Sequence, residues 1–137
     1  MINRELFEDH IKRAKLRFRI LGEYLQEKDY ADVIRTSQEI IELIQKAILI
    51  KIGIKPPKWH EVIDVILENK EKLSDDVNRE LIKLRKDSKW LRSQREIAFY
   101  GDVDFIPIKD YTLKDARKAI SIAEKFLGII EKISRQE

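Results

Sequence analysis

The sequence contains no cysteine, and that absence excludes disulfides, thiolate metal sites and cysteine nucleophiles. Only 4 glycines and 3 prolines interrupt its 137 residues, so few breaks divide regular secondary structure. No stretch approaches the ~18 consecutive apolar residues that a membrane-spanning helix needs. The charged N-terminal residues are not followed by the apolar core of a secretory signal. We therefore predict a cytoplasmic protein without disulfides or a membrane span.

The composition is typical of a globular helical protein. Hydrophobic residues make up 43% of the chain and charged residues 39%, which is too apolar for disorder and too charged for a membrane protein. The length fits one domain, which we place at residues 1–137. Abundant lysine and glutamate with a single methionine favour a thermophilic source, although AT-rich coding produces a similar excess of lysine.

Apolar residues recur at spacings of three and four, which is the helical period. The pattern and the capping residues predict helices over residues 4–26, 30–52, 57–69, 75–98 and 113–133. The fold class we expect is all-α, an up-and-down bundle of about five helices. Two of these helices, 30–52 and 113–133, are apolar over most of their circumference. This width exceeds what one small bundle buries, so we expect a homodimer through one of them.

Charge is unevenly distributed along the chain. Residues 79–95 hold seven cations against two carboxylates, and residues 59–78 hold six carboxylates against two lysines. The basic stretch could bind a polyanion, or the two stretches could form complementary solvated helix faces. Lys89 and Arg92 belong to this strip, where they could follow a phosphate backbone or simply face solvent.

Arg95 falls on the apolar stripe of its helix, where an arginine is not expected. An unpaired buried charge is costly, so Arg95 needs a partner. That partner is either an internal carboxylate, such as Asp102 or Asp104, or the phosphate of a ligand. Tyr100 could stack on a base or donate to a phosphate, or it could close the end of the bundle.

Other candidate residues have structural alternatives as well. His60 could act as a general base if a partner lies nearby, or it could make a structural hydrogen bond. Trp59 and Trp90 are predicted to be core or interface anchors. The aspartates near Asp102 do not match the spacing of a calcium loop, so we predict neither a metal site nor a cofactor.

Three segments of the chain resemble the HEPN family of helical bundles, and an archaeal-type branch in particular. They are Asp32-Val33-Ile34-Arg35-Thr36-Ser37-Gln38-Glu39, Gly53-Ile54-Lys55-Pro56-Pro57-Lys58-Trp59-His60 and Arg95-Glu96-Ile97-Ala98-Phe99-Tyr100-Gly101-Asp102. The resemblance implies a bundle of four or more helices that usually dimerises. It also implies links to nucleotide binding, to metal-independent RNA cleavage, and to toxin–antitoxin pairs with a nucleotidyltransferase-like partner.

The ribonuclease members use an arginine followed, after four to six residues, by a histidine. Arg95 matches that arginine, but Tyr100 stands where the histidine would be, and no histidine follows Arg95. An imidazole exchanges protons near neutral pH, whereas a phenol titrates near pH ~10. The resemblance therefore makes Arg95 a candidate phosphate ligand and Tyr100 its aromatic neighbour, without implying catalysis.

We expect a HEPN-like module that binds nucleotide or RNA at a dimer cleft without efficient catalysis, in a toxin–antitoxin or defence system. The candidate binding residues are Arg95, Tyr100, Asp102, Arg92, Lys89 and His60. One alternative is a metal-independent ribonuclease toxin that uses Arg95 with Tyr100 or His60. Another is a protein-interaction bundle that pairs with a nucleotidyltransferase-like protein or another acidic partner.

Overall fold

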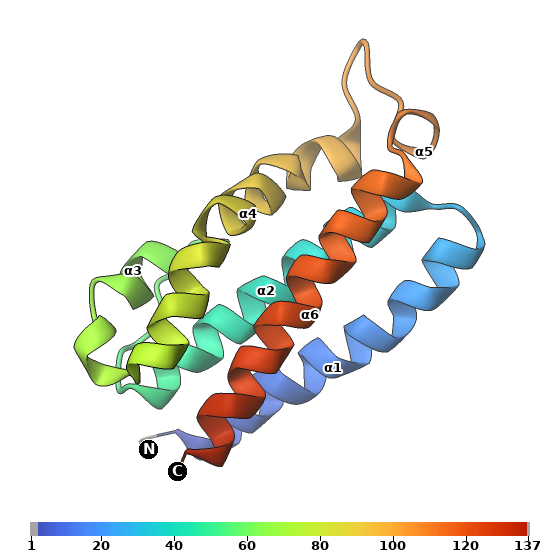
Figure 1. Ribbon diagram of the computed structural model, residues 1–137. Helices are drawn as coiled ribbons and strands as arrows, with labels where there is room; N and C mark the ends of the chain where they lie inside the picture. The colour runs from blue at the N-terminus through green and yellow to red at the C-terminus, as the bar shows by residue number, and fades with distance from the viewer. Residues whose placement is uncertain (1–2, 137) are drawn as a thin grey trace.

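The computed structural model describes residues 3–136, and it confirms an all-α bundle (Figure 1). Four long helices form the bundle: α1 (Arg4–Gln26), α2 (Tyr30–Lys51), α4 (Asp75–Tyr100) and α6 (Leu113–Arg135). The connections contain the short helices α3 (Ile63–Leu67) and α5 (Pro107–Asp110) and the 3-10 turn η1 (Lys70–Lys72). No helix within the described residues is long and apolar enough to cross a bilayer.

Helix α2 is the centre of the bundle, and it packs against each of the other long helices (Figure 1). It begins where the Asp29 side chain accepts a hydrogen bond from the Asp32 amide at 3.0 Å. Its largest fully buried side chains form a wide face of the helix: Ile34, Ile40, Ile41, Ile44, Ile48 and Leu49. A helix with so wide an apolar face requires more than one neighbour, and α1, α4 and α6 provide them.

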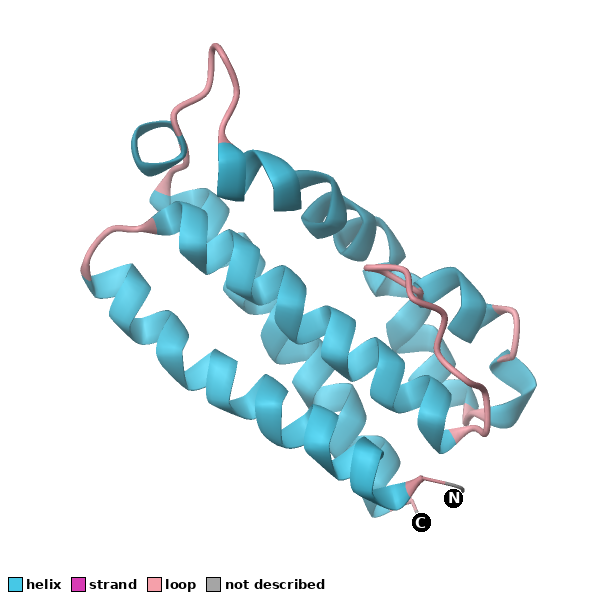
Figure 2. Cartoon of the chain, turned by 180° about the vertical axis from the view of Figure 1, so that it is seen from behind, coloured by secondary structure: helices cyan, strands magenta, loops and turns pink. Residues whose placement is uncertain are grey.

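The apolar surfaces of α2 and α6 are therefore covered within one chain, which removes the reason for which we expected a dimer through either helix. Large apolar side chains are exposed elsewhere, mainly between the end of α4 and α5: Phe99, Tyr100, Val103, Ile106 and Ile108. Figure 2 shows this connection projecting beyond the end of the bundle. Homodimerisation stays a prediction, and this end of the bundle is the exposed apolar surface available for it.

The predicted third helix, 57–69, is wrong at its N-terminal end, because α3 begins only at Ile63. Two glutamine side chains of α2 explain the difference. Gln38 Nε2 donates to the carbonyl oxygen of His60 at 2.9 Å, and the Val62 amide donates to Gln45 Oε1 at 2.9 Å. These bonds hold backbone groups of the segment before α3 against α2, so those groups do not enter helical hydrogen bonds.

The end of α4 is a tight turn that only glycine fits. Gly101 has φ 74°, and its amide donates to the carbonyl oxygen of Ile97 at 2.9 Å. A Cβ atom at this position would lie 3.0 Å from Pro107 Cδ. The left-handed conformation ends the helix immediately after Tyr100, which leaves this side chain at the exit of α4.

Candidate phosphate-binding site

A pocket of about 200 Å³ lies between the first half of α2 and the last two turns of α4, and we call it the Arg95 pocket. Its lining residues are Arg35, Glu39, Arg95, Glu96, Phe99 and Tyr100. The two helices run in opposite directions, since Arg35 lies near Phe99 while Gln45 bonds Ser88 farther along. Spacings of three and four place each set of lining residues on one face of its helix.

Arg95 is half-buried, and its Nε atom is buried without a hydrogen-bond partner. Within residues 3–136 its guanidinium makes no ion pair, so the structure does not contain the internal salt bridge to Asp102 or Asp104. Its charge adds to a lowering of the pKa of Glu96, which is caused first by the hydrogen bond from Arg92. A charged donor left unsatisfied at the edge of a pocket favours an anion from outside the chain.

Arg35 is the cation that the sequence analysis did not select. It bonds Asp32 at 3.0 Å and Glu39 at 2.8 Å, and its guanidinium carbon lies 5.8 Å from the ring centroid of Phe99. Burial alone would lower the pKa of Arg35, but the hydrogen bond to Asp32 and the charge of Glu39 outweigh burial and raise it. In the sequence, Arg35 stands within one helical turn of Asp32 and Glu39. That spacing indicates a surface ion pair and does not point to a binding site.

Two aromatic rings form the open side of the pocket. Phe99 is 61% exposed and Tyr100 is 78% exposed, and their rings meet edge to face with centroids 4.8 Å apart. Tyr100 therefore does not close the end of the bundle. Tyr111 has that role, because it is buried and donates from its hydroxyl to Gln94 Oε1 at 2.9 Å. Burial, with a smaller effect of the Asp115 charge, raises the pKa of Tyr111 to about 12.

Asp102 does not line the Arg95 pocket. Its Oδ1 atom accepts from the Val103 amide at 2.8 Å, and its backbone exchanges hydrogen bonds with Phe105. Asp110 has a similar role, accepting from the Ile106 amide at 2.6 Å. These aspartates stabilise turns, and residues 3–136 contain no group of three His, Asp or Glu side chains that could hold a metal ion.

The remaining candidates line a second pocket of about 440 Å³, which we call the Trp59 pocket. Its lining residues are Lys58, Trp59, His60, Glu61, Lys89 and Arg92. The sequence predicts Trp59 to be a core or an interface anchor. It is 62% exposed, so the core alternative is wrong and the interface alternative stays a prediction. His60 Nδ1 lies 3.4 Å from Glu42 Oε1, a contact that fits both roles predicted for His60, a structural hydrogen bond and a general base with a nearby partner.

Both cations of the strip that we selected are paired. Lys89 Nζ lies 2.7 Å from Glu61 Oε1 and 3.1 Å from Asp64 Oδ2. Burial tends to lower the pKa of Lys89, but its hydrogen bonds to these carboxylates outweigh burial and raise it. Arg92 donates to both carboxylate oxygens of Glu96, at 3.1 and 2.9 Å. The six candidates thus divide between the Arg95 pocket, the Trp59 pocket and a turn.

A family model for the HEPN domain matches residues 7–133, which covers both pockets. The chain belongs to the HEPN domain family. Comparisons with curated proteins and with solved structures gave no match. In this HEPN domain neither pocket brings a histidine beside Arg95, since the only histidine that lines either of them is His60 of the Trp59 pocket.

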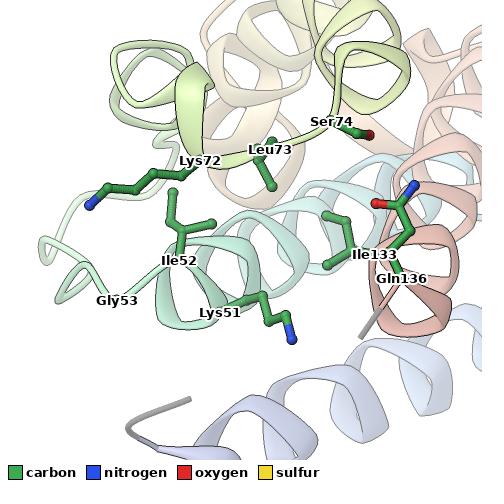
Figure 3. A pocket seen from close by; sticks show the side chains of 8 residues that line it. All are labelled: Lys51, Ile52, Gly53, Lys72, Leu73, Ser74, Ile133 and Gln136. Atoms are coloured by element: carbon green, nitrogen blue, oxygen red, sulfur yellow. The ribbon is translucent and has the colours of Figure 1, made fainter.

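A larger pocket, of about 570 Å³, lies at the opposite end of the HEPN domain (Figure 3). Its lining residues are Lys51, Ile52, Gly53, Lys72, Leu73, Ser74, Ile133 and Gln136. Figure 3 shows apolar side chains from three segments around it, while the side chain of Lys72 extends away. Size alone does not identify a site, and among the described residues no buried polar side-chain atom without a hydrogen-bond partner belongs to the lining of this pocket, whereas Arg95 Nε is such an atom in the Arg95 pocket.

Proposed function

We propose that this HEPN domain binds a phosphate-bearing ligand, a nucleotide or RNA, at the Arg95 pocket and does not catalyse its cleavage efficiently. The observation that carries the proposal is Arg95, which is half-buried and has no ion-pair partner within the described residues, in a pocket that is also lined by two exposed aromatic residues. A guanidinium presents a planar set of donors that matches the oxygens of a phosphate. Exposed rings provide stacking surfaces for a base.

The charge balance of the pocket supports one phosphate rather than several. Glu39 is neutralised by Arg35 at 2.8 Å, and Glu96 is neutralised by Arg92 at 2.9 Å. Arg95 is then the only lining cation within the described residues whose charge has no bonded partner. A single surplus charge in a pocket of this size fits one phosphate group with an adjacent base.

The proposal is tested by thermal unfolding with inorganic phosphate, ATP, GTP and a short RNA, because a ligand of the folded state must raise the midpoint. We expect nucleotide or RNA to raise the midpoint of the wild type, and Arg95→Ala to weaken binding at least ~10-fold, since a charged hydrogen bond contributes ~1.5–3 kcal/mol. Arg79→Ala is the matched control, because Arg79 lies on the same helix, its side chain is 68% exposed, and within the described residues its ion pair is with Asp76.

Equal midpoint shifts in the wild type and in Arg95→Ala would contradict this site, and so would the absence of any shift with all four ligands. The Arg79→Ala control removes the same charge far from the pocket, so it separates a local contact from a general loss of positive potential. A reduced midpoint of Arg95→Ala without ligand would instead indicate that the arginine has a structural role.

The ribonuclease alternative is tested on the same samples. No imidazole lines the Arg95 pocket, so no side chain there exchanges protons readily at neutral pH. We expect no RNA cleavage by the wild type in EDTA. Cleavage that disappears in Arg95→Ala would establish catalysis and overturn this part of the proposal. Homodimerisation and pairing with a nucleotidyltransferase-like protein stay predictions.

A further inference from the structure

We propose that the ligand is a single-stranded oligonucleotide rather than a mononucleotide, and that the Trp59 pocket binds a second nucleotide of the same strand. This inference rests on the proposed function, because it takes the Arg95 pocket as the first phosphate site. It adds a second stacking surface, Trp59, and a second cation, Lys58.

Trp59 is a large apolar side chain that is exposed beside a backbone segment hydrogen-bonded to α2. It is 62% exposed, and the residue after it is fixed by the bond from Gln38 Nε2 to the His60 carbonyl oxygen. Two residues farther on, Gln45 holds the amide of Val62. An exposed tryptophan whose following backbone is anchored suits stacking on a ligand, because less of this segment has to become ordered when a base binds.

The two pockets are neighbours on the same face of α4. Arg92 lines the Trp59 pocket and Glu96 lines the Arg95 pocket, and these two side chains are bonded to each other at 2.9 and 3.1 Å. From Lys89 to Phe99 the helix rises about 15 Å, at ~1.5 Å per residue. A stacked strand covers that distance in about four nucleotides, at ~3.4 Å each. A mononucleotide is too short to occupy both pockets.

Each pocket combines an exposed aromatic ring with a cation that has no partner in the described chain. Lys58 is exposed and makes no ion pair within residues 3–136, and Arg95 provides the equivalent charge in the other pocket. Alternation of unpaired cations and stacking surfaces is how proteins bind single strands without reading base edges. Bases within a duplex are not available for such stacking, so the arrangement favours a single strand over a double strand.

The chain offers a direct spectroscopic test, because it has only two tryptophans. Trp90 lies beneath Lys118 and lines neither pocket, so Trp90→Phe leaves Trp59 as the only tryptophan. We expect oligouridylates of four to eight nucleotides to quench its emission and to bind at least tenfold more tightly than uridine monophosphate. The corresponding oligothymidylates distinguish RNA from DNA as the source of the strand.

Variants in the otherwise wild-type chain complete the test by fluorescence anisotropy with a labelled octauridylate. Trp59→Ala should weaken binding about fivefold or more, consistent with the loss of one stacked base, and Trp59→Phe should restore most of it. Ile82→Ala is the matched control, since Ile82 is also an exposed apolar residue, lies on α4 and lines neither pocket.

Failure of this inference is distinguishable from failure of the proposed function. Equal affinity for monophosphate and octauridylate, with unchanged emission of Trp59 and weaker binding in Arg95→Ala, would overturn the second pocket and leave the first intact. Binding that is insensitive to Arg95→Ala but lost in Trp59→Ala would place the ligand at the Trp59 pocket alone and overturn the proposed function. The absence of binding by any probe would overturn both.

Discussion

Helix α4 carries cations in its middle and near its C-terminal end, but the fold uses them differently. In the middle, Arg85 and Lys89 are bonded to Asp64 and Glu61 at 2.7 Å. At its last turns, Arg95 has no bonded partner within the described residues. In sequence all three belong to one basic stretch, and only Arg95 falls on the apolar stripe of the helix. The comparison teaches that a cation is available to a ligand only where the fold places no carboxylate beside it.

The middle of α4, which carries the paired cations, takes part in a buried hydrogen-bond network. Glu61 has a side chain that is only 3% exposed, and it accepts from Ser88 Oγ at 2.5 Å as well as from Lys89. Ser88 in turn accepts from Gln45 Nε2 at 2.7 Å. One carboxylate thus connects α2, α4 and the segment before α3, so the cation that it binds belongs to the structure of the bundle.

The largest expected effect comes from breaking this network. Glu61→Ala removes the acceptor of a buried hydroxyl and of a lysine, and it should lower the free energy of unfolding by about 2–3 kcal/mol. Urea denaturation measures the change. Glu68→Ala is the control, because Glu68 is exposed and its substitution removes the same charge at the C-terminal end of α3. Similar losses in both variants would mean that net charge, and not the network, is responsible.

The opposite result is expected at the unpaired end. Arg95→Leu replaces a half-buried charge that lacks a partner with an apolar side chain, and it should raise the free energy of unfolding by about 1 kcal/mol in the absence of ligand. Leu91→Ala, one turn earlier on the same helix and fully buried, should lower it by ~2–5 kcal/mol and shows that the assay is sensitive here. A loss of stability in Arg95→Leu would contradict the contrast between the paired cations in the middle of α4 and the unpaired Arg95 near its end.

The helices were predictable because their signals are local. Ser74 caps α4 by accepting from the Val77 amide at 3.3 Å, and Thr112 and Asp115 form a capping box at the start of α6, as their sequence spacing indicates. The apolar periods of the long helices also lie within single segments. Arg95 was recognised for the same reason, since it interrupts such a period.

The remainder of the site depends on contacts between residues far apart in the chain. Glu61 meets Ser88 and Lys89 only after α2 and α4 have packed, and no local pattern joins them. The same packing holds the segment after Trp59 against α2, which shortens α3 and leaves the tryptophan exposed. Charge counting along the sequence therefore overestimated the free basic surface, because pairing across segments is a property of the tertiary structure.

The smallest expected effect would convert a paired cation into a free one. Glu96→Gln removes the carboxylate that binds Arg92 and that also faces Arg95, so the affinity for octauridylate should rise about threefold. The stability loss should stay below ~0.5 kcal/mol, because the pair is an exposed i,i+4 pair. Glu131→Gln is the matched control. It makes the same change of charge and releases Lys15, which lines neither pocket, so affinity should not rise.

The affinity difference between the wild type and Glu96→Gln should depend on pH, because it depends on the ion pair between Arg92 and Glu96. The hydrogen bond from Arg92 lowers the pKa of Glu96 in the folded chain, so the pair is intact above the ordinary glutamate pKa of ~4.3 and is lost as pH falls through the lowered value. The advantage of Glu96→Gln in binding should therefore be complete at neutral pH and shrink below pH ~4. An advantage that is independent of pH would show that the carboxylate charge is not what restrains Arg92, and the contrast between paired and free cations would then fail at the boundary of the two pockets.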